Sequence, residues 1–385
     1  MDDFSAIQRL IAYYGSLLLI GLIVGMLGPA LTILADQTHS TLAGVSLLLA
    51  VRPMGYMASV LFSGWLLDRR IPGHTMLAIA TLGAGLLLAI TPTRTTLLQL
   101  AGVFLALGVT MGVMDVGSAT LLSWSYAERL APYLSGLHFS FGLGAFLSPL
   151  LLSTSLDYGL GGWGAFTFLA LLAIPLALWQ FAAPNPTHRP ENCNQTFPID
   201  WYLVAGFAGF FFLYGGAEAG FGAWIYQYAL AFNTLDSHSA SWLTALFWGL
   251  LGGGRLGGIA LLARFTPRSV LWIFLPLAWI CLTVLLIAPD LPYMLWMGCA
   301  GAGLFMACIF PSMLAHAARV LTVDGRLSGR VGSAFFLGSS SGAMVLPWLM
   351  GQAFSFWGPR WIMVIISGAI LIAFMVFILF LARND

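Results

Sequence analysis

Five ionisable side chains lie inside apolar stretches of this 385-residue chain that are long enough to cross a lipid bilayer. They are Arg52, Asp115, His138, Glu218 and Arg255. A charged side chain at the centre of a bilayer costs about 2.5–3.5 kcal/mol on insertion scales, so such groups carry protons, ions or ligands, or pair with one another. These five residues are therefore the first candidates for chemistry.

Glu218 is the strongest candidate for a carboxylate that couples transport to a proton or a cation, because its apolar surroundings suit a protonation switch. Nearby glycines predict that its helix bends or unwinds there and frees backbone carbonyls for a ligand or an ion. Alternatively, Glu218 pairs with an arginine and holds two helices together. The glycines are Gly215, Gly216, Gly220 and Gly222.

Arg52 has two interpretations, and so has the pair Asp115 and His138. Arg52, near the middle of its stretch, either anchors an acidic group or a sugar hydroxyl or forms a fixed ion pair. Asp115 and His138 either form a proton relay or a hydrogen-bonded pair that stabilises the inner end. Arg255 is closer to the predicted cytoplasmic side, where we expect it to close the second half of the chain.

Aromatic side chains surround Glu218 in the sequence. Tyr214 and Phe221 fall at helical spacing from it, and Trp224 follows on another face. Aromatic rings stack on the C–H faces of sugars while a nearby carboxylate binds the hydroxyls. The alternative is that each ring packs against a neighbouring helix or faces lipid.

The composition indicates the elements that hold these residues. Only 8% of residues are charged and 60% are hydrophobic, whereas a typical soluble domain has about 25% charged residues. This excludes a soluble enzyme, a nucleic-acid binder and a disordered protein, and it predicts an all-α membrane protein. We expect twelve membrane-spanning helices, at 10–34, 42–67, 74–91, 96–124, 131–156, 160–182, 201–231, 240–263, 268–288, 291–318, 328–353 and 357–382.

Arginines orient these spans, because cytoplasmic loops carry an excess of positive charge. With a cytoplasmic N-terminus, only Arg94 and Arg360 lie in outer segments. The inner segments then hold Arg9, Arg69, Arg70, Arg129, Arg189, Arg264, Arg268, Arg319, Arg326, Arg330 and Arg383. We therefore expect both termini in the cytoplasm.

The chain divides into two related halves. A proline-rich linker at 183–200 separates a bundle at 1–182 from a bundle at 201–385. Span five contains Gly144-Ala-Phe-Leu-Ser-Pro149, and span eleven contains Gly342-Ala-Met-Val-Leu-Pro347 with the same spacing. We expect these small residues to allow close approach of helices, either for gating or for packing alone.

The loop after span two carries Gly64-Trp-Leu-Leu-Asp68-Arg69, which resembles the loop motif of the major facilitator superfamily. The resemblance covers the whole chain and implies two pseudo-repeated six-helix bundles, with Gly64, Asp68 and Arg69 latching the cytoplasmic ends in the outward-open state. The stretches 136–149 and 214–224 resemble spans five and seven of the fucose-permease and sodium-dependent-glucose-transporter branch.

Taken together, the residues and the resemblance predict a secondary transporter in the cell membrane, without enzymatic activity, cofactor, metal or nucleic-acid partner. We expect a monomer that moves a sugar or sugar-like solute by alternating access, coupled to H⁺ or Na⁺. The alternatives are a drug or metabolite efflux antiporter and, in a different class, a sensor or assembly partner that does not transport.

Overall fold

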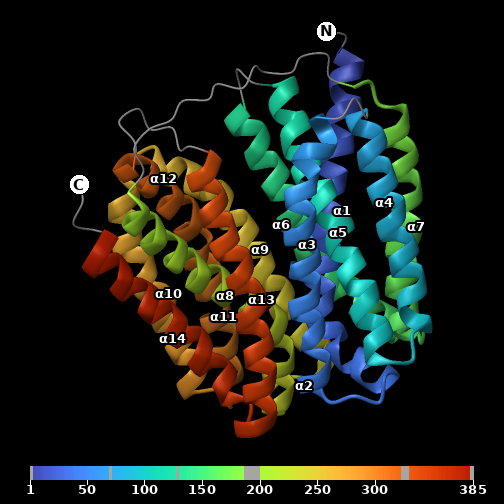
Figure 1. Ribbon diagram of the computed structural model, residues 1–385. Helices are drawn as coiled ribbons and strands as arrows, with labels where there is room; N and C mark the ends of the chain where they lie inside the picture. The colour runs from blue at the N-terminus through green and yellow to red at the C-terminus, as the bar shows by residue number, and fades with distance from the viewer. Residues whose placement is uncertain (1–2, 69–71, 127–129, 186–199, 322–328, 382–385) are drawn as a thin grey trace. The chain divides into compact units, whose positions relative to one another are not determined.

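A computed structural model describes residues 3–68, 72–126, 130–185, 200–321 and 329–381. In these ranges the chain is helical, without any strand (Figure 1). Twelve of the described helical segments are long and apolar enough to cross a membrane. The prediction of an all-α fold with twelve spans is thus confirmed.

The helices follow the predicted spans closely. In the first half they are α1 (Asp3–Gln37), α2 (Leu42–Val45), α3 (Leu47–Asp68), α4 (Gly73–Ile90), α5 (Leu97–Ser125), α6 (Leu130–Asp157) and α7 (Gly161–Ala182). In the second half they are α8 (Trp201–Ala231), α9 (Ser237–Leu262), α10 (Pro267–Ile287), α11 (Pro292–Ala307), α12 (Ile309–Leu321), α13 (Gly329–Trp357) and α14 (Arg360–Val376), which continues into a π-helical turn at Phe377–Leu381.

Short polar side chains start several of these helices. Thr96, Asp236 and Thr266 each accept a hydrogen bond from the backbone N–H three residues later, which satisfies one of the free donors of a first turn. Glycine serves the tight turns between helices, with φ of +73° at Gly159 and +94° at Gly358. Local sequence therefore sets where most spans begin and turn.

The chain forms two compact units, residues 1–191 and 192–385. The division falls inside the predicted linker, most of which lies outside the described residues. The exact linker and bundle boundaries stay a prediction.

Corresponding helices pack together in the two units. In the first unit, α1 packs against α6, and a Cβ at Gly144 would collide with the Leu18 carbonyl oxygen. In the second unit, α8 packs against α13 (Figure 1), and a Cβ at Gly342 would collide with the Phe212 carbonyl oxygen. The repeat seen in the sequence is therefore a repeat of close helix crossings, where glycine lets two backbones meet.

The expectation that span seven unwinds around Glu218 is wrong. Helix α8 is continuous from Trp201 to Ala231. Its glycines are used for packing instead, because Gly216 lies against Gly342 and Leu346 of α13, and Gly222 lies against Trp248 of α9.

Two spans that were predicted as uninterrupted helices are broken, span two at Ser46 between α2 and α3, and span ten at Cys308. Helix α11 ends at Ala307, Cys308 is in a turn, and α12 begins at Ile309. Pro311 provides the reason, because proline has no N–H to donate to the carbonyl of Ala307 and its ring crowds that carbonyl. Pro311 is tolerated in the first turn of α12, where no donor is needed.

Candidate functional site

The second unit holds a compact ionic cluster between α8 and α9. Arg255 Nη2 lies 2.8 Å from Glu218 Oε1 and 3.0 Å from Oε2, so one nitrogen serves both carboxylate oxygens. Tyr214, one helical turn before Glu218, also lies against this carboxylate, with its hydroxyl 2.7 Å from Oε2. The side chains of Arg255 and Glu218 keep 25% and 17% of their surface exposed, so the pair is accessible from one side.

The same tyrosine joins the cluster to the break in span ten. Its hydroxyl lies 2.6 Å from the carbonyl oxygen of Met306, which is in the last turn of α11. At the break itself, the Cys308 thiol points back to the Gly254 carbonyl at 3.6 Å. Three helical segments therefore meet at Glu218.

A buried ion pair of this kind is not in itself a strong stabiliser. Desolvation of two charges offsets much of their attraction, but removal of one partner leaves an uncompensated charge and is strongly destabilising. The arrangement agrees with both sequence interpretations of Glu218. Its carboxylate holds α8 to α9 through Arg255, and a single proton would neutralise the same carboxylate.

The first unit holds a second polar cluster around Asp115 on α5. Its Oδ2 accepts a hydrogen bond of 2.6 Å from the hydroxyl of Tyr56 on α3, and His138 on α6 interacts with it electrostatically. The structure thus brings Asp115 and His138 within electrostatic range of each other, and the proton relay and the hydrogen-bonded pair considered for them stay predictions. Tyr56 was missed, because 59 residues separate it from Asp115 and no local pattern links them.

Arg52 has a different environment from Arg255. It lies one turn before Tyr56 on α3 and interacts electrostatically with it, yet its buried Nε has no hydrogen-bond partner within the described part of the chain. No carboxylate among the described residues forms an ion pair with it. The fixed ion pair considered for Arg52 is therefore not present in the described structure.

The aromatic candidates are fully covered inside the second unit. Tyr214, Phe221 and Trp224 each have 0% exposed surface. Phe221 packs on Phe247, and the indole N–H of Trp224 donates a hydrogen bond of 2.8 Å to the Pro347 carbonyl. In this state they pack between helices and do not face a solute.

The gating candidates divide into two groups. Gly144, Pro149, Gly342 and Pro347 lie in the close crossings of α6 with α1 and of α13 with α8, where Pro347 also accepts the bond from Trp224. Of the loop motif, Arg69 and the side chain of Asp68 lie outside the described residues, and Gly64 is placed only as part of α3. The predicted latch stays a prediction.

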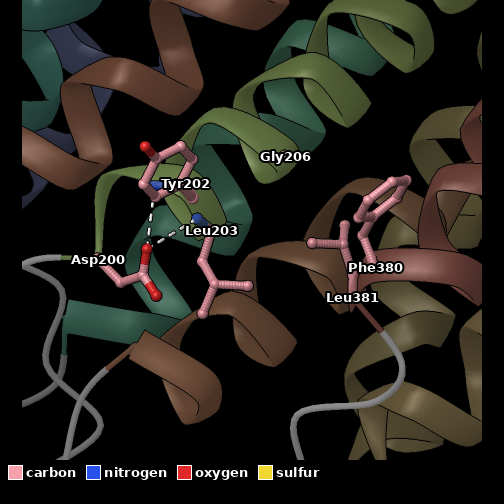
Figure 2. A pocket seen from close by; sticks show the side chains of 6 residues that line it. All are labelled: Asp200, Tyr202, Leu203, Gly206, Phe380 and Leu381. Atoms are coloured by element: carbon pink, nitrogen blue, oxygen red, sulfur yellow. Dashed lines mark hydrogen bonds between the residues drawn. The ribbon is translucent and has the colours of Figure 1, made fainter.

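A surface cavity of about 290 Å³ opens between the start of α8 and the π-helical turn at Phe377–Leu381 (Figure 2). Asp200 contributes its carboxylate there, but that group caps α8 by accepting bonds from the N–H groups of Tyr202 and Leu203. Leu203, Phe380 and Leu381 supply apolar lining, and Tyr202 adds a phenol group. The cavity is thus mostly apolar, and none of the ionisable candidates from the sequence lines it.

Twelve spans in two related bundles, each with ionisable side chains held among its helices, define the class of polytopic membrane transport proteins. Within that class, the chain belongs to the Major Facilitator Superfamily, whose family model matches residues 13–339. The resemblance inferred from the loop after span two is confirmed.

Individual relatives and a solved structure agree with this membership. The chain is 26% identical to the sodium-dependent glucose transporter 1 of Xenopus laevis, over 85% of this chain and 72% of that protein. It is 25% identical to the human protein of the same name, over 87% and 71%. A crystal structure of a mutant of the nucleoside transporter NupG superposes with a TM-score of 0.80 at 13% identity, covering 96% of this chain and 99% of that one. The chain is accordingly a secondary transporter of a small polar solute embedded in a membrane by multiple passes.

Proposed function

We propose that the solute is a sugar or a sugar-like compound and that its transport by alternating access is coupled to H⁺. The observation that carries the proposal is the Arg255–Glu218–Tyr214 cluster, in which one carboxylate holds a cation and a hydroxyl at the edge of a helix break. The similarity to proteins named sodium-dependent glucose transporter 1 supports a sugar.

The two units supply different chemistry to this function. The first unit has hydrogen-bonding groups suited to a polyhydroxylated ligand, namely Asp115, Tyr56, His138 and the unpaired Nε of Arg52. Carboxylate and guanidinium groups form strong charge-assisted hydrogen bonds with hydroxyls. The second unit supplies Glu218, whose charge changes with one proton. We therefore assign solute binding to the first cluster and ion coupling to the second.

The geometry favours H⁺ over Na⁺ as the coupling ion at Glu218. Arg255 already lies within 3.0 Å of both carboxylate oxygens, so a sodium ion bound there would be next to a permanent positive charge. A proton needs no such space, and it converts the carboxylate into a neutral donor. Sodium coupling would require Arg255 to leave the carboxylate first.

Uptake into proteoliposomes tests this proposal. Radiolabelled glucose and a panel of other sugars are offered under an imposed pH gradient, an imposed Na⁺ gradient or neither. We expect accumulation that follows the pH gradient, and Glu218→Gln should lose accumulation while it keeps exchange of solute across the membrane. Accumulation at the wild-type level in Glu218→Gln removes Glu218 from coupling, and a lack of uptake for every sugar overturns the proposed solute class.

We infer the remaining features of the transporter from the arginine distribution and the size of the units. It acts as a monomer in the cell membrane with both termini in the cytoplasm.

A further inference from the structure

One hydroxyl proton faces two acceptors at Tyr214. The hydroxyl oxygen lies 2.7 Å from Glu218 Oε2 and 2.6 Å from the Met306 carbonyl oxygen, and both distances are those of short O–H···O hydrogen bonds. A tyrosine has a single O–H, so it can donate to only one of them at a time. Tyr214 is fully buried, so water does not supply the missing donor from the tyrosine side.

The protonation state of Glu218 determines which acceptor receives the hydrogen bond from the Tyr214 hydroxyl. When Glu218 carries a proton, its O–H donates to the Tyr214 oxygen, and Tyr214 donates to Met306, so both contacts are hydrogen bonds. When Glu218 is ionised, its charge attracts the Tyr214 hydrogen, and the Met306 carbonyl then faces an oxygen lone pair at 2.6 Å. The Met306 carbonyl then loses its tyrosine donor and keeps only the Cys308 N–H, and it lies against an oxygen lone pair at a distance that suits only a hydrogen bond.

The Met306 carbonyl, which gains or loses the hydrogen bond from Tyr214, lies at the break in span ten. Pro311 removes the amide that would bond Ala307, and the Cys308 N–H turns back to the Met306 carbonyl. Tyr214 is thus a tertiary donor for the end of α11, where helical hydrogen bonding stops. Loss or gain of a hydrogen bond at this carbonyl therefore acts on a stretch of backbone that has few helical hydrogen bonds of its own.

Few other charged or titratable groups among the described residues lie near Glu218 and Tyr214. Arg255 from α9 faces Glu218 and stays charged in both states, and the Cys308 thiol at the break is the other titratable neighbour of the cluster. The stretches 331–357 of α13 and 361–376 of α14 contain no ionisable residue. From α12, His316 is bonded to the Leu381 carbonyl at 3.0 Å.

We propose that Tyr214 is a positioning residue that transmits the protonation of Glu218 to the break in span ten, fixing the break when Glu218 is protonated and releasing it when Glu218 is ionised. The proposal deepens the proposed function and rests on its assignment of Glu218 to proton coupling. It predicts that the backbone around Cys308 opens as pH rises.

Cys308 provides the measurement, because it lies in the break and is 4% exposed. In a variant that keeps Cys308 and carries alanine at Cys193, Cys281 and Cys299, a small thiol-reactive reagent is applied to proteoliposomes at a series of pH values that extends far enough down to protonate Glu218. The labelling rate is divided at each pH by that of the same protein with Tyr214→Phe, which removes the intrinsic titration of the thiol from the result.

We expect this ratio to be about tenfold higher when Glu218 is ionised than when it is protonated, which corresponds to about 1.4 kcal/mol. Glu218→Gln, which imitates the protonated acid, should hold the ratio at its low-pH value. Tyr228→Phe is the matched control, since Tyr228 is a buried tyrosine of the same helix whose hydroxyl donates a hydrogen bond of 2.7 Å to the Leu285 carbonyl. That variant should keep the wild-type profile.

A second variant keeps the test decisive if Tyr214→Phe folds poorly. Pro311→Ala restores the amide donor for the Ala307 carbonyl, so Cys308 labelling should be slow and independent of Glu218 across the range. The proposal is overturned if Tyr214→Phe or Pro311→Ala shows the wild-type profile, or if Glu218→Gln leaves the pH dependence intact. Sugar uptake in the same vesicles separates this outcome from failure of the proposed function, because labelling reports the break whether or not a sugar is transported.

Discussion

At the scale of single residues, the second unit concentrates its chemistry on one carboxylate. Glu218 contacts Arg255 from α9 and Tyr214 from its own helix, and Tyr214 contacts the Met306 carbonyl of α11. The two interpretations of Glu218, coupling and helix pairing, therefore describe the same atoms. Separating them requires a change that keeps the local charge balanced and removes the titrating group.

A double variant makes this separation. Arg255→Gln alone leaves Glu218 as an uncompensated charge, and breaking such a pair costs about 3–5 kcal/mol when it is buried and less for a partly exposed one. Glu218→Gln with Arg255→Gln removes both charges, so we expect thermal stability in detergent to recover most of that loss. Accumulation driven by a pH gradient should stay absent.

The two measurements in the same double variant have distinct meanings. Recovery of stability without recovery of accumulation assigns coupling to the ionisable group. Recovery of both would show that the pair serves only to join α8 to α9 and that coupling resides elsewhere, with Asp115 and His138 as the next pair of groups to test.

At the scale of elements, glycine determines which helices meet closely. Gly144 on α6 and Gly342 on α13 occupy matching positions in the two halves, and each lies against a backbone carbonyl of the partner helix. Without side chains at these positions, dispersion contacts between backbones replace the hydrophobic driving force that helices lack in lipid. In the second unit, the crossing at Gly342 fixes α8 against α13, and through it the position of Glu218.

Substitution at the crossing should therefore be far more costly than substitution elsewhere. Gly342→Ala places a methyl group into the Phe212 carbonyl, and overpacking of this kind costs about 1–3 kcal/mol. Gly368→Ala in α14 is the matched control, because nothing lies within 4 Å of the added Cβ. It should be neutral or slightly stabilising, since alanine favours helix over glycine by about 1 kcal/mol. Thermal unfolding of both variants in one detergent makes the comparison, and equal melting temperatures would contradict the close crossing.

At the scale of the whole molecule, two units repeat one packing plan but differ in chemistry. The first unit places Asp115, Tyr56 and His138 on three different helices, whereas the second places Glu218 and Tyr214 on one helix. Duplication preserved the glycine crossings and left the polar groups free to diverge. Such asymmetry suits a transporter in which one half binds solute and the other responds to a coupling ion.

The orientation of the molecule is a separate prediction. Eleven arginines lie in the segments assigned to the cytoplasm and two in the outer segments, Arg94 and Arg360. A reporter that is active only in the cytoplasm, fused after Asp385, should be active, and the same reporter inserted in the 158–160 turn between α6 and α7 should be inactive. The reverse pattern would invert the topology and with it the side from which Arg255 is reached.

The sequence by itself determined the number of spans, the two related halves and the small set of buried charges, because the cost of polar groups in lipid makes each apolar run and each exception to it visible. It also indicated that Asp115 lies near His138. Tertiary structure alone decided which groups meet. Tyr56 contacts Asp115, Arg255 contacts Glu218, and Tyr214 contacts Met306. These contacts depend on the register between packed helices, which the 3.6-residue periodicity of a single helix does not predict.

The break in the backbone illustrates the same division. The glycines around Glu218 indicated that span seven unwinds. In the structure these glycines pack against α13 and α9, and α8 stays a continuous helix. Pro311 was the better signal, because it lacks the amide that would bond the Ala307 carbonyl and so interrupts the helix. Only the folded chain shows that the Tyr214 hydroxyl lies against the neighbouring Met306 carbonyl, and that the same hydroxyl contacts Glu218.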